Sequence, residues 1–180
     1  MISGFIGTHQ SAIWMGDFGY VTVMPEVDSV KTAPEARHLP FSHGNETATP
    51  YYYSVAMDAG AERAIRTEVT ATEHCALLKI TYPECKNSSL VMEATRPGVV
   101  GFSAVDPDTR EMSGYNPDRM DSHLTTLKLP DFKGYFVVQL SKPFQTCGTY
   151  LDNGMGDWRP AATGKNAGTS LPGKRFTRTP

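Results

Sequence analysis

Apolar and polar residues alternate along most of this chain in short runs, and no long helical repeat interrupts them. In Ile65-Arg66-Thr67-Glu68-Val69, the apolar ends share one face of an extended strand, while Arg66 and Glu68 share the other. Gly, Pro, Asn and Asp separate the runs at intervals of about 8 to 12 residues, a spacing typical of sandwiches and barrels. The pattern therefore predicts an all-β domain with strands over Tyr20–Met24, Tyr51–Asp58, Ile65–Thr72, Cys75–Tyr82, Ser89–Ala94, Val99–Val105, Glu111–Tyr115, Leu124–Leu129, Tyr135–Leu140 and Gln145–Leu151.

Both ends of the chain depart from this alternation. Residues 1–50 are rich in Gly and Pro, with Trp14, Phe18 and Phe41 scattered among them, so we expect long ordered loops there. From Asp157 onward there is almost no apolar periodicity, which predicts a frayed or unfolded tail.

Length and composition narrow the kind of protein further. The 180 residues suffice for one sizeable core, and 39% hydrophobic with 20% charged residues is typical of a soluble globular protein. The net charge of −2 gives no reason to expect a nucleic-acid partner. No apolar run reaches the ~18 residues that a membrane span needs. The start of the chain shows no secretory signal, so a cytoplasmic location stays open.

Familiar catalytic motifs are absent from the sequence. The run from Gly101 to Val105 begins like a nucleophile turn around Ser103, but it ends in valine where that turn needs glycine. Gly164-Lys165 is followed by Asn166 rather than Ser or Thr, so it is no phosphate-binding loop. The 19 acidic residues show no spacing that identifies a catalytic pair. A zinc site is not expected, and a disulfide cannot be assigned, among the three cysteines Cys75, Cys85 and Cys147.

Two polar clusters are compatible with sugar binding. Trp14 beside Asp17 in a Gly-rich loop suits a pyranose, because an indole packs on C–H groups while a carboxylate binds hydroxyls. A second cluster places His43 and Glu46 close together just before an aromatic strand. Simpler explanations stay open for both, since Trp14 can anchor its loop to the sandwich and the second cluster can be a polar turn.

Taken in order along the chain, these clusters resemble glycoside hydrolase family 92, and its fungal members especially. The resemblance spans residues 4–168 and rests on the segments Gly4–Asp17, Leu39–His43, Asn45-Glu46, Pro50–Val55, Glu68–Thr72 and Ile80–Pro83. It implies the N-terminal antiparallel β-sandwich, with long N-terminal loops, of a calcium-dependent exo-α-mannosidase that inverts the anomeric centre. In such enzymes the sandwich packs on an (α/α)6 barrel, which mainly carries the calcium and the catalytic carboxylates.

The resemblance also implies roles and partners. Trp14, Asp17, His43 and Glu46 are expected to contact substrate, and this chain is expected to hold no catalytic residue, metal or cofactor. The expected partners are an α-mannoside or N-glycan and the barrel domain, with neither nucleic acid nor membrane. Full-length relatives act outside the cell or in the secretory pathway, and this chain alone is expected to be inactive.

Two departures from the family pattern bear on domain organisation. His74-Cys75-Ala76 stands where relatives often carry an Arg-containing turn. After Gly168 the family continues into an apolar strand, whereas this chain turns to Thr169-Ser170-Leu171-Pro172 and a basic end. We therefore expect a domain over residues 1–168 and a divergent, disordered tail over 169–180, as in a truncated or mis-spliced product. A stand-alone carbohydrate-binding module and an inert fragment stay open as alternatives.

Overall fold

The computed structural model describes residues 1–7, 21–94, 100–117, 131, 133–151, 154–155, 161–165 and 168–173. Within these ranges the protein is nearly all β, and every strand pair is antiparallel. One short helix there, α2 (Pro34–Arg37), begins with a proline, whose fixed φ suits the first helical turn. None of the helical residues in these ranges belongs to a helix long and apolar enough to cross a membrane. The predicted antiparallel all-β fold is confirmed.

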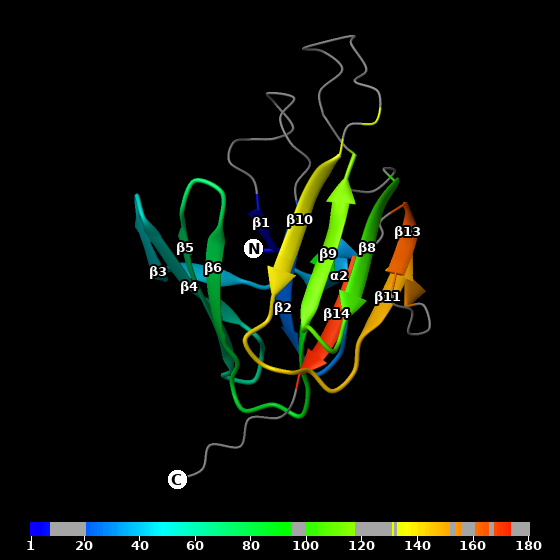
Figure 1. Ribbon diagram of the computed structural model, residues 1–180. Helices are drawn as coiled ribbons and strands as arrows, with labels where there is room; N and C mark the ends of the chain where they lie inside the picture. The colour runs from blue at the N-terminus through cyan, green and yellow to red at the C-terminus, as the bar shows by residue number, and fades with distance from the viewer. Residues whose placement is uncertain are drawn as a thin grey trace.

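The strands form three sheets (Figure 1). The largest has six strands in the order β1 (Phe5–Gly7), β2 (Val21–Val27), β7 (Ser88–Glu93), β14 (Gly168–Gly173), β11 (Gly148–Leu151) and β12 (Gly154–Met155). A second sheet has the order β10 (Gly134–Gln139), β9 (Glu111–Asn116), β8 (Val100–Asp106) and β13 (Ala161–Lys165). The third has the order β3 (Phe41–Thr49), β4 (Tyr52–Asp58), β5 (Ala64–Ala71) and β6 (Ala76–Thr81).

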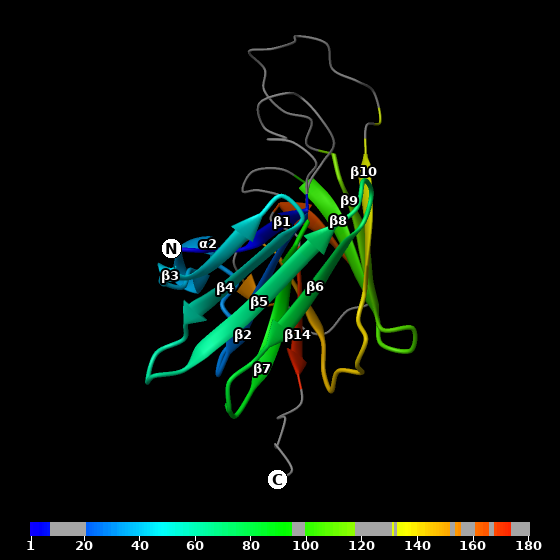
Figure 2. The same ribbon diagram turned by 90° about the vertical axis from the view of Figure 1, so that its left-hand side faces the viewer.

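The six-stranded sheet packs against both of the other sheets. Strand β2 shows this directly, because successive side chains of a strand point to opposite faces. Val23 joins a core cluster with residues of β7, β8 and β9, whereas Met24 joins one with residues of β4 and β5. Every residue of β7 is buried, as expected for a strand covered on both faces. Figure 2 shows the β3–β6 sheet lying across β2, β7 and β14 on one side of this middle layer.

Most strands predicted from the alternation are present, with ends that differ by up to three residues. The predicted strand over Leu124–Leu129 lies outside the described residues. The predicted strand at Tyr20–Met24 is present as β2, whereas the expectation of long loops over the rest of residues 1–50 is wrong for the parts that form β1, α2 and β3. Strand β3 was not predicted because it is an exposed edge strand. Its residues are mostly polar and lack the alternation of apolar and polar side chains that marks a half-buried strand. Its register also shifts between Phe41 and Glu46.

The expectation of an unstructured C-terminal tail is likewise wrong where the structure describes it. Strand β13 pairs with β8, and β14 is inserted between β7 and β11. These segments consist largely of Ala, Gly, Thr and Ser, so they lack the apolar alternation that marks strands. Hydrogen bonding on both sides of β14 compensates for its weak intrinsic preference. The division into a domain over 1–168 and a tail stays a prediction, and residues 174–180 lie outside the described ranges.

Candidate functional site

Three polar side chains meet at the edge strand β3 and form what we call the rim cluster: His43, Glu46 and Tyr53. Nδ1 of His43 lies 2.5 Å from Oε2 of Glu46, and the Tyr53 hydroxyl donates to Oε1 of Glu46 at 2.7 Å. The His43 side chain is 87% exposed, whereas that of Glu46 is only 20% exposed. The carboxylate thus sits between two donors and fixes an imidazole that faces solvent.

Strand pairing explains why these residues meet. Glu46 pairs with Val55 and Ala48 pairs with Tyr53, so Glu46 and Tyr53 are diagonal neighbours on one face of the β3–β4 hairpin. The irregularity in β3 before Glu46 brings His43 back toward the same carboxylate. The ring of Phe41 supports the imidazole edge-on, with centroids 5.2 Å apart.

The hydrogen bonds of the rim cluster hold Glu46 in its ionised form. The Tyr53 hydroxyl and then His43 lower the pKa of Glu46 below its ordinary value. Burial and the bond to Glu46 raise the pKa of Tyr53 to about 12, so that Tyr53 remains a donor at neutral pH. Because an ionised carboxylate can only accept, Nδ1–H of His43 donates the hydrogen bond to Glu46, and Nε2 of the exposed ring is left available to a ligand.

A similar trio on the opposite face of the same sheet offers a natural comparison. Tyr52 donates to Oε1 of Glu68 at 2.8 Å, and Lys79 lies 3.0 Å from Oε2 of the same carboxylate. These residues belong to three adjacent strands in register, and they form a polar ladder of the solvent-facing kind.

A second polar cluster is buried beneath α2 and centres on Arg37, which is only 3% exposed. Its guanidinium donates to the carbonyls of Ser3 and Thr32, at 3.1 and 3.2 Å, and is ion-paired with Glu93 on β7. Tyr150 of β11 lies close enough for the two charges to act on its hydroxyl. Because the donors of Arg37 bind Ser3, Thr32 and Glu93 of the protein itself, this cluster links segments of the fold rather than binding a ligand.

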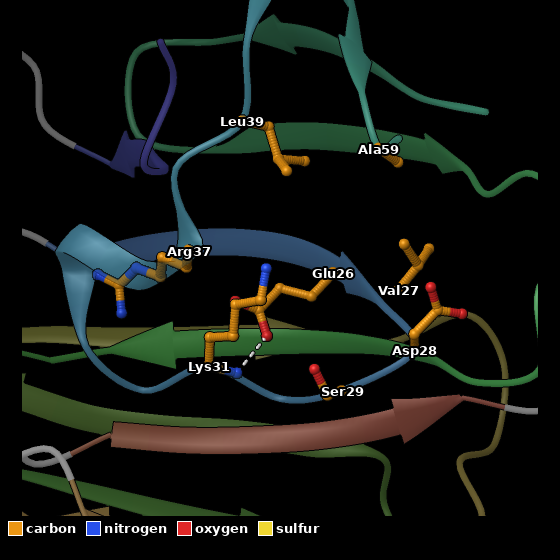
Figure 3. Close-up of a pocket in the computed structure, with 8 residues that line it drawn as sticks. All are labelled: Glu26, Val27, Asp28, Ser29, Lys31, Arg37, Leu39 and Ala59. Atoms are coloured by element: carbon orange, nitrogen blue, oxygen red, sulfur yellow. Dashed lines mark hydrogen bonds between the residues drawn. The ribbon is translucent and has the colours of Figure 1, made fainter. Parts of the chain in front are cut away.

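A small cavity adjoins the buried cluster (Figure 3). It measures about 140 Å³ and is lined by Glu26, Val27, Asp28, Ser29, Lys31, Arg37, Leu39 and Ala59. Burial raises the pKa of Glu26 to about 7, against the opposing effects of the Lys31 amide and the charges of Lys31 and Arg37.

Comparison with known proteins decides the family. The sequence model of the glycosyl hydrolase family 92 N-terminal domain matches residues 1–172. The chain belongs to this family. A family GH92 inverting mannosidase from Bacteroides thetaiotaomicron VPI-5482 superposes with a TM-score of 0.81 at 27% sequence identity, over 96% of this chain and 22% of that one. No match was found among curated proteins.

A second solved structure, the GH92 family glycosyl hydrolase ccman5, superposes with a TM-score of 0.67 over 86% of this chain. Its 22% identity supports the fold alone. Our chain spans 22% of each of these two structures, about a fifth of their length. The described residues therefore correspond to the N-terminal domain of glycoside hydrolase family 92.

The sequence-based site residues of this family 92 domain fall into two groups. His43 and Glu46 are brought into direct contact, whereas Trp14 and Asp17 lie outside the described residues. Their contacts with substrate stay a prediction. Tyr53 was missed, although its place in the aromatic run that begins β4 and the hairpin pairing with β3 could have suggested it. None of the three cysteines forms a disulfide.

The hydrogen bonds of the rim cluster allow a prediction about the pKa of Glu46 in this family 92 domain. Replacing Tyr53 by Phe removes the largest cause of the lowered pKa of Glu46, so that pKa should rise toward its ordinary value. Carboxyl chemical shifts of Glu46 followed by NMR across pH 2 to 7 measure the change. Tyr52→Phe serves as the control, because it should raise the pKa of Glu68 and leave that of Glu46 unchanged. An unchanged Glu46 titration in Tyr53→Phe would contradict the described hydrogen bond.

Proposed function

We propose that this domain is part of an exo-α-mannosidase and that its rim cluster contributes to the mannose pocket. The observation that carries the proposal is the exposed imidazole of His43, held by the ionised carboxylate of Glu46. Such an arrangement presents Nε2 at a fixed orientation, which suits hydrogen bonding to a sugar hydroxyl. The likeness to an inverting mannosidase at 27% identity supports mannose as the sugar.

In this proposal Trp14 and Asp17 line the same pocket, with the indole packed on the pyranose and the carboxylate on its hydroxyls. His43 positions a hydroxyl through Nε2, while Tyr53 and Glu46 maintain the tautomer of the ring. N-glycan-type α-mannosides are the proposed substrates, and an (α/α)6 barrel domain is the proposed partner. None of these residues is assigned to proton transfer at the glycosidic bond.

Inversion at the anomeric carbon requires a general acid and a general base about 6.5–9.5 Å apart, with water between them. We propose that both belong to the barrel domain, together with the calcium ion of the family. Within the described ranges there is no group of three or more His, Cys, Asp and Glu side chains that could hold a metal ion.

Titration of the chain with methyl α-mannoside tests the proposal. We expect saturable shifts of the His43 ring resonances in NMR spectra, with a Kd of about 1–10 mM, as for a pocket with only part of its contacts. Glu46→Gln should weaken binding about tenfold, because it removes the charge that orients the ring. Glu68→Gln is the matched control on the opposite face and should bind like the original chain.

The same samples are assayed for release of mannose from α-mannosides in the presence of calcium. Binding without release supports the proposed division of labour, and it is also the result expected of a stand-alone carbohydrate-binding module. Mixing the chain with a barrel domain distinguishes the two explanations. Turnover should be restored if the chain is part of a mannosidase, and it should stay absent if the chain is a stand-alone binding module. Absence of any His43 shift at concentrations on the order of 100 mM would overturn the proposed contact. Turnover by the chain alone would show that the catalytic groups lie within it.

A further inference from the structure

Glu26 is a buried carboxyl group with an incomplete set of hydrogen bonds. It lies near the end of β2 opposite Ser89 of β7 and is 4% exposed. Its Oε2 accepts the backbone N–H of Lys31 at 2.8 Å, whereas its buried Oε1 has no hydrogen-bond partner among the residues that the structure describes. An ionised carboxylate in this position lacks the solvation that its charge requires.

Charged and titratable groups face Glu26 from several elements of the fold. Lys31 and Arg37 are cationic, and the hydroxyls of Tyr82 and Tyr150 stay neutral because burial raises their pKa. Two other carboxylates of the surroundings are ion-paired, Asp28 with Arg63 and Glu93 with Arg37. Glu35 of α2 lies near Glu93, and the thiol of Cys85 lies near Tyr82. Burial raises the pKa of two of these carboxyl groups, Glu26 and Glu93, and only Glu26 accepts the Lys31 amide, so replacement of Glu26 separates their contributions.

The cavity next to Glu26 supplies room for the ionised form. Its volume of about 140 Å³ is enough for several water molecules. Figure 3 shows Ser29 and Lys31 of the segment of residues 28–33 on one side of the cavity and Leu39 and Ala59 on the other. A modest movement of this segment would let the Glu26 carboxylate reach water and the ammonium group of Lys31.

The segment of residues 28–33 is held less firmly than the strand before it. Strand β2 is hydrogen-bonded on both sides, to β1 and β7. The segment, by contrast, begins with Asp28 at a φ of 67°, a left-handed conformation that is uncommon outside glycine. Its backbone bonds include those from Asp28 N–H to the Asn87 carbonyl and from Lys31 N–H to Glu26 itself, while Arg37 donates to the Thr32 carbonyl near its far end. Opening of such a segment requires far less than global unfolding.

We propose that Glu26 is a proton-operated latch on the segment of residues 28–33. The protonated carboxyl keeps the segment closed over the end of β2. The ionised carboxyl moves into the adjoining cavity, is solvated there, and releases the Lys31 amide, so that the segment opens. The segment leads through α2 to β3, which connects the latch to the strand that bears His43. The latch is independent of whether His43 binds sugar.

The sign of the pH dependence follows from the raised pKa of Glu26. The closed form holds its proton up to about pH 7, whereas an open, solvated form loses it near 4.5. Closure is therefore fully favoured below about pH 4.5, weakens about tenfold per pH unit up to about pH 7, and levels off above that. The equilibrium constant for opening should rise about 300-fold over this range.

Hydrogen exchange of the Lys31 amide, measured by NMR from pH 4.5 to 8.5, reports the latch directly. After correction for intrinsic exchange rates, the Lys31 protection factor should fall about tenfold per pH unit up to about pH 7 and stay constant above it. Low concentrations of urea should leave it unchanged, whereas they should lower the protection of Met92 in the buried strand β7. Glu26→Gln should make Lys31 protection independent of pH, and Glu35→Gln on α2 should keep the original profile.

A fall in Lys31 protection that follows Met92 with the same urea dependence would overturn the latch, since only global unfolding would then occur. Persistence of the pH profile in Glu26→Gln would assign it to another group. If Glu26→Gln fails to fold, Ala59→Val provides the second test, because it fills part of the cavity while retaining the carboxyl. The latch requires that this variant show higher Lys31 protection above pH 7, and an unchanged value contradicts it.

Discussion

Arg37→Ala is expected to lower the free energy of unfolding by about 3–5 kcal/mol at pH 7, the range for breaking a buried ion pair from one side. The substitution leaves the buried carboxylate of Glu93 without its cation and removes the donors of the Ser3 and Thr32 carbonyls. Urea unfolding followed by far-UV circular dichroism measures the change. Burial already raises the pKa of Glu93, so protonation of that group at lower pH should recover part of the loss.

The exposed ion pair between Arg63 and Asp28 provides the control for Arg37. Arg63 donates to both carboxylate oxygens of Asp28, yet both side chains are accessible to water. Arg63→Ala is therefore expected to change stability by less than about 1 kcal/mol. Similar effects of the two substitutions would mean that burial of Arg37 contributes nothing beyond an ordinary surface contact.

Met92→Ala is expected to be the most harmful single truncation in the apolar core, at about 2–5 kcal/mol. Met92 has no exposed surface and lies in β7, the strand that the middle sheet buries on both faces. Its side chain belongs to the cluster shared with β8 and β9, so the substitution leaves a cavity between the two sheets. Thermal and urea unfolding of the variant give the magnitude.

Met24→Ala tests whether the two cores are energetically separate. Met24 packs against β4 and β5, on the face of the middle sheet opposite to Met92. The two side chains belong to different buried clusters, although the partly buried Ile80 packs against both. If the sheet separates them, the effects of Met24→Ala and Met92→Ala should add within about 0.5 kcal/mol in the double variant. A strongly non-additive result would show that the middle sheet transmits strain between its faces.

The alternation of apolar residues predicted the strands that have one buried face, such as β4 and β5. It could not reveal β3, which is polar because it lies at an edge, or β14, whose pairing on both sides does not depend on apolar side chains. The local sequence shows well which residues of a strand are buried, because they are apolar. It does not carry the long-range hydrogen bonding that makes a strand of Gly, Thr and Ser stable.

The candidate site was predictable only in part for a related reason. His43 and Glu46 are near in sequence, so a short-range argument found them. Tyr53 joins them through hairpin register, and Arg37 meets Glu93 across a long separation. A charged side chain is expected at the surface unless a partner is known, and that partner appears only in three dimensions.

The position of β14 has a consequence for how this domain acquires its structure during synthesis. Gly173 pairs with Ser88, and Gly168 pairs with Glu93, so one side of the buried strand β7 stays unpaired until almost the whole domain has left the ribosome. At translation rates of about 5–20 residues per second, that delay lasts on the order of seconds. An uncovered β edge of this kind is a template for intermolecular pairing, and nascent chains of this domain should depend on chaperones during that interval.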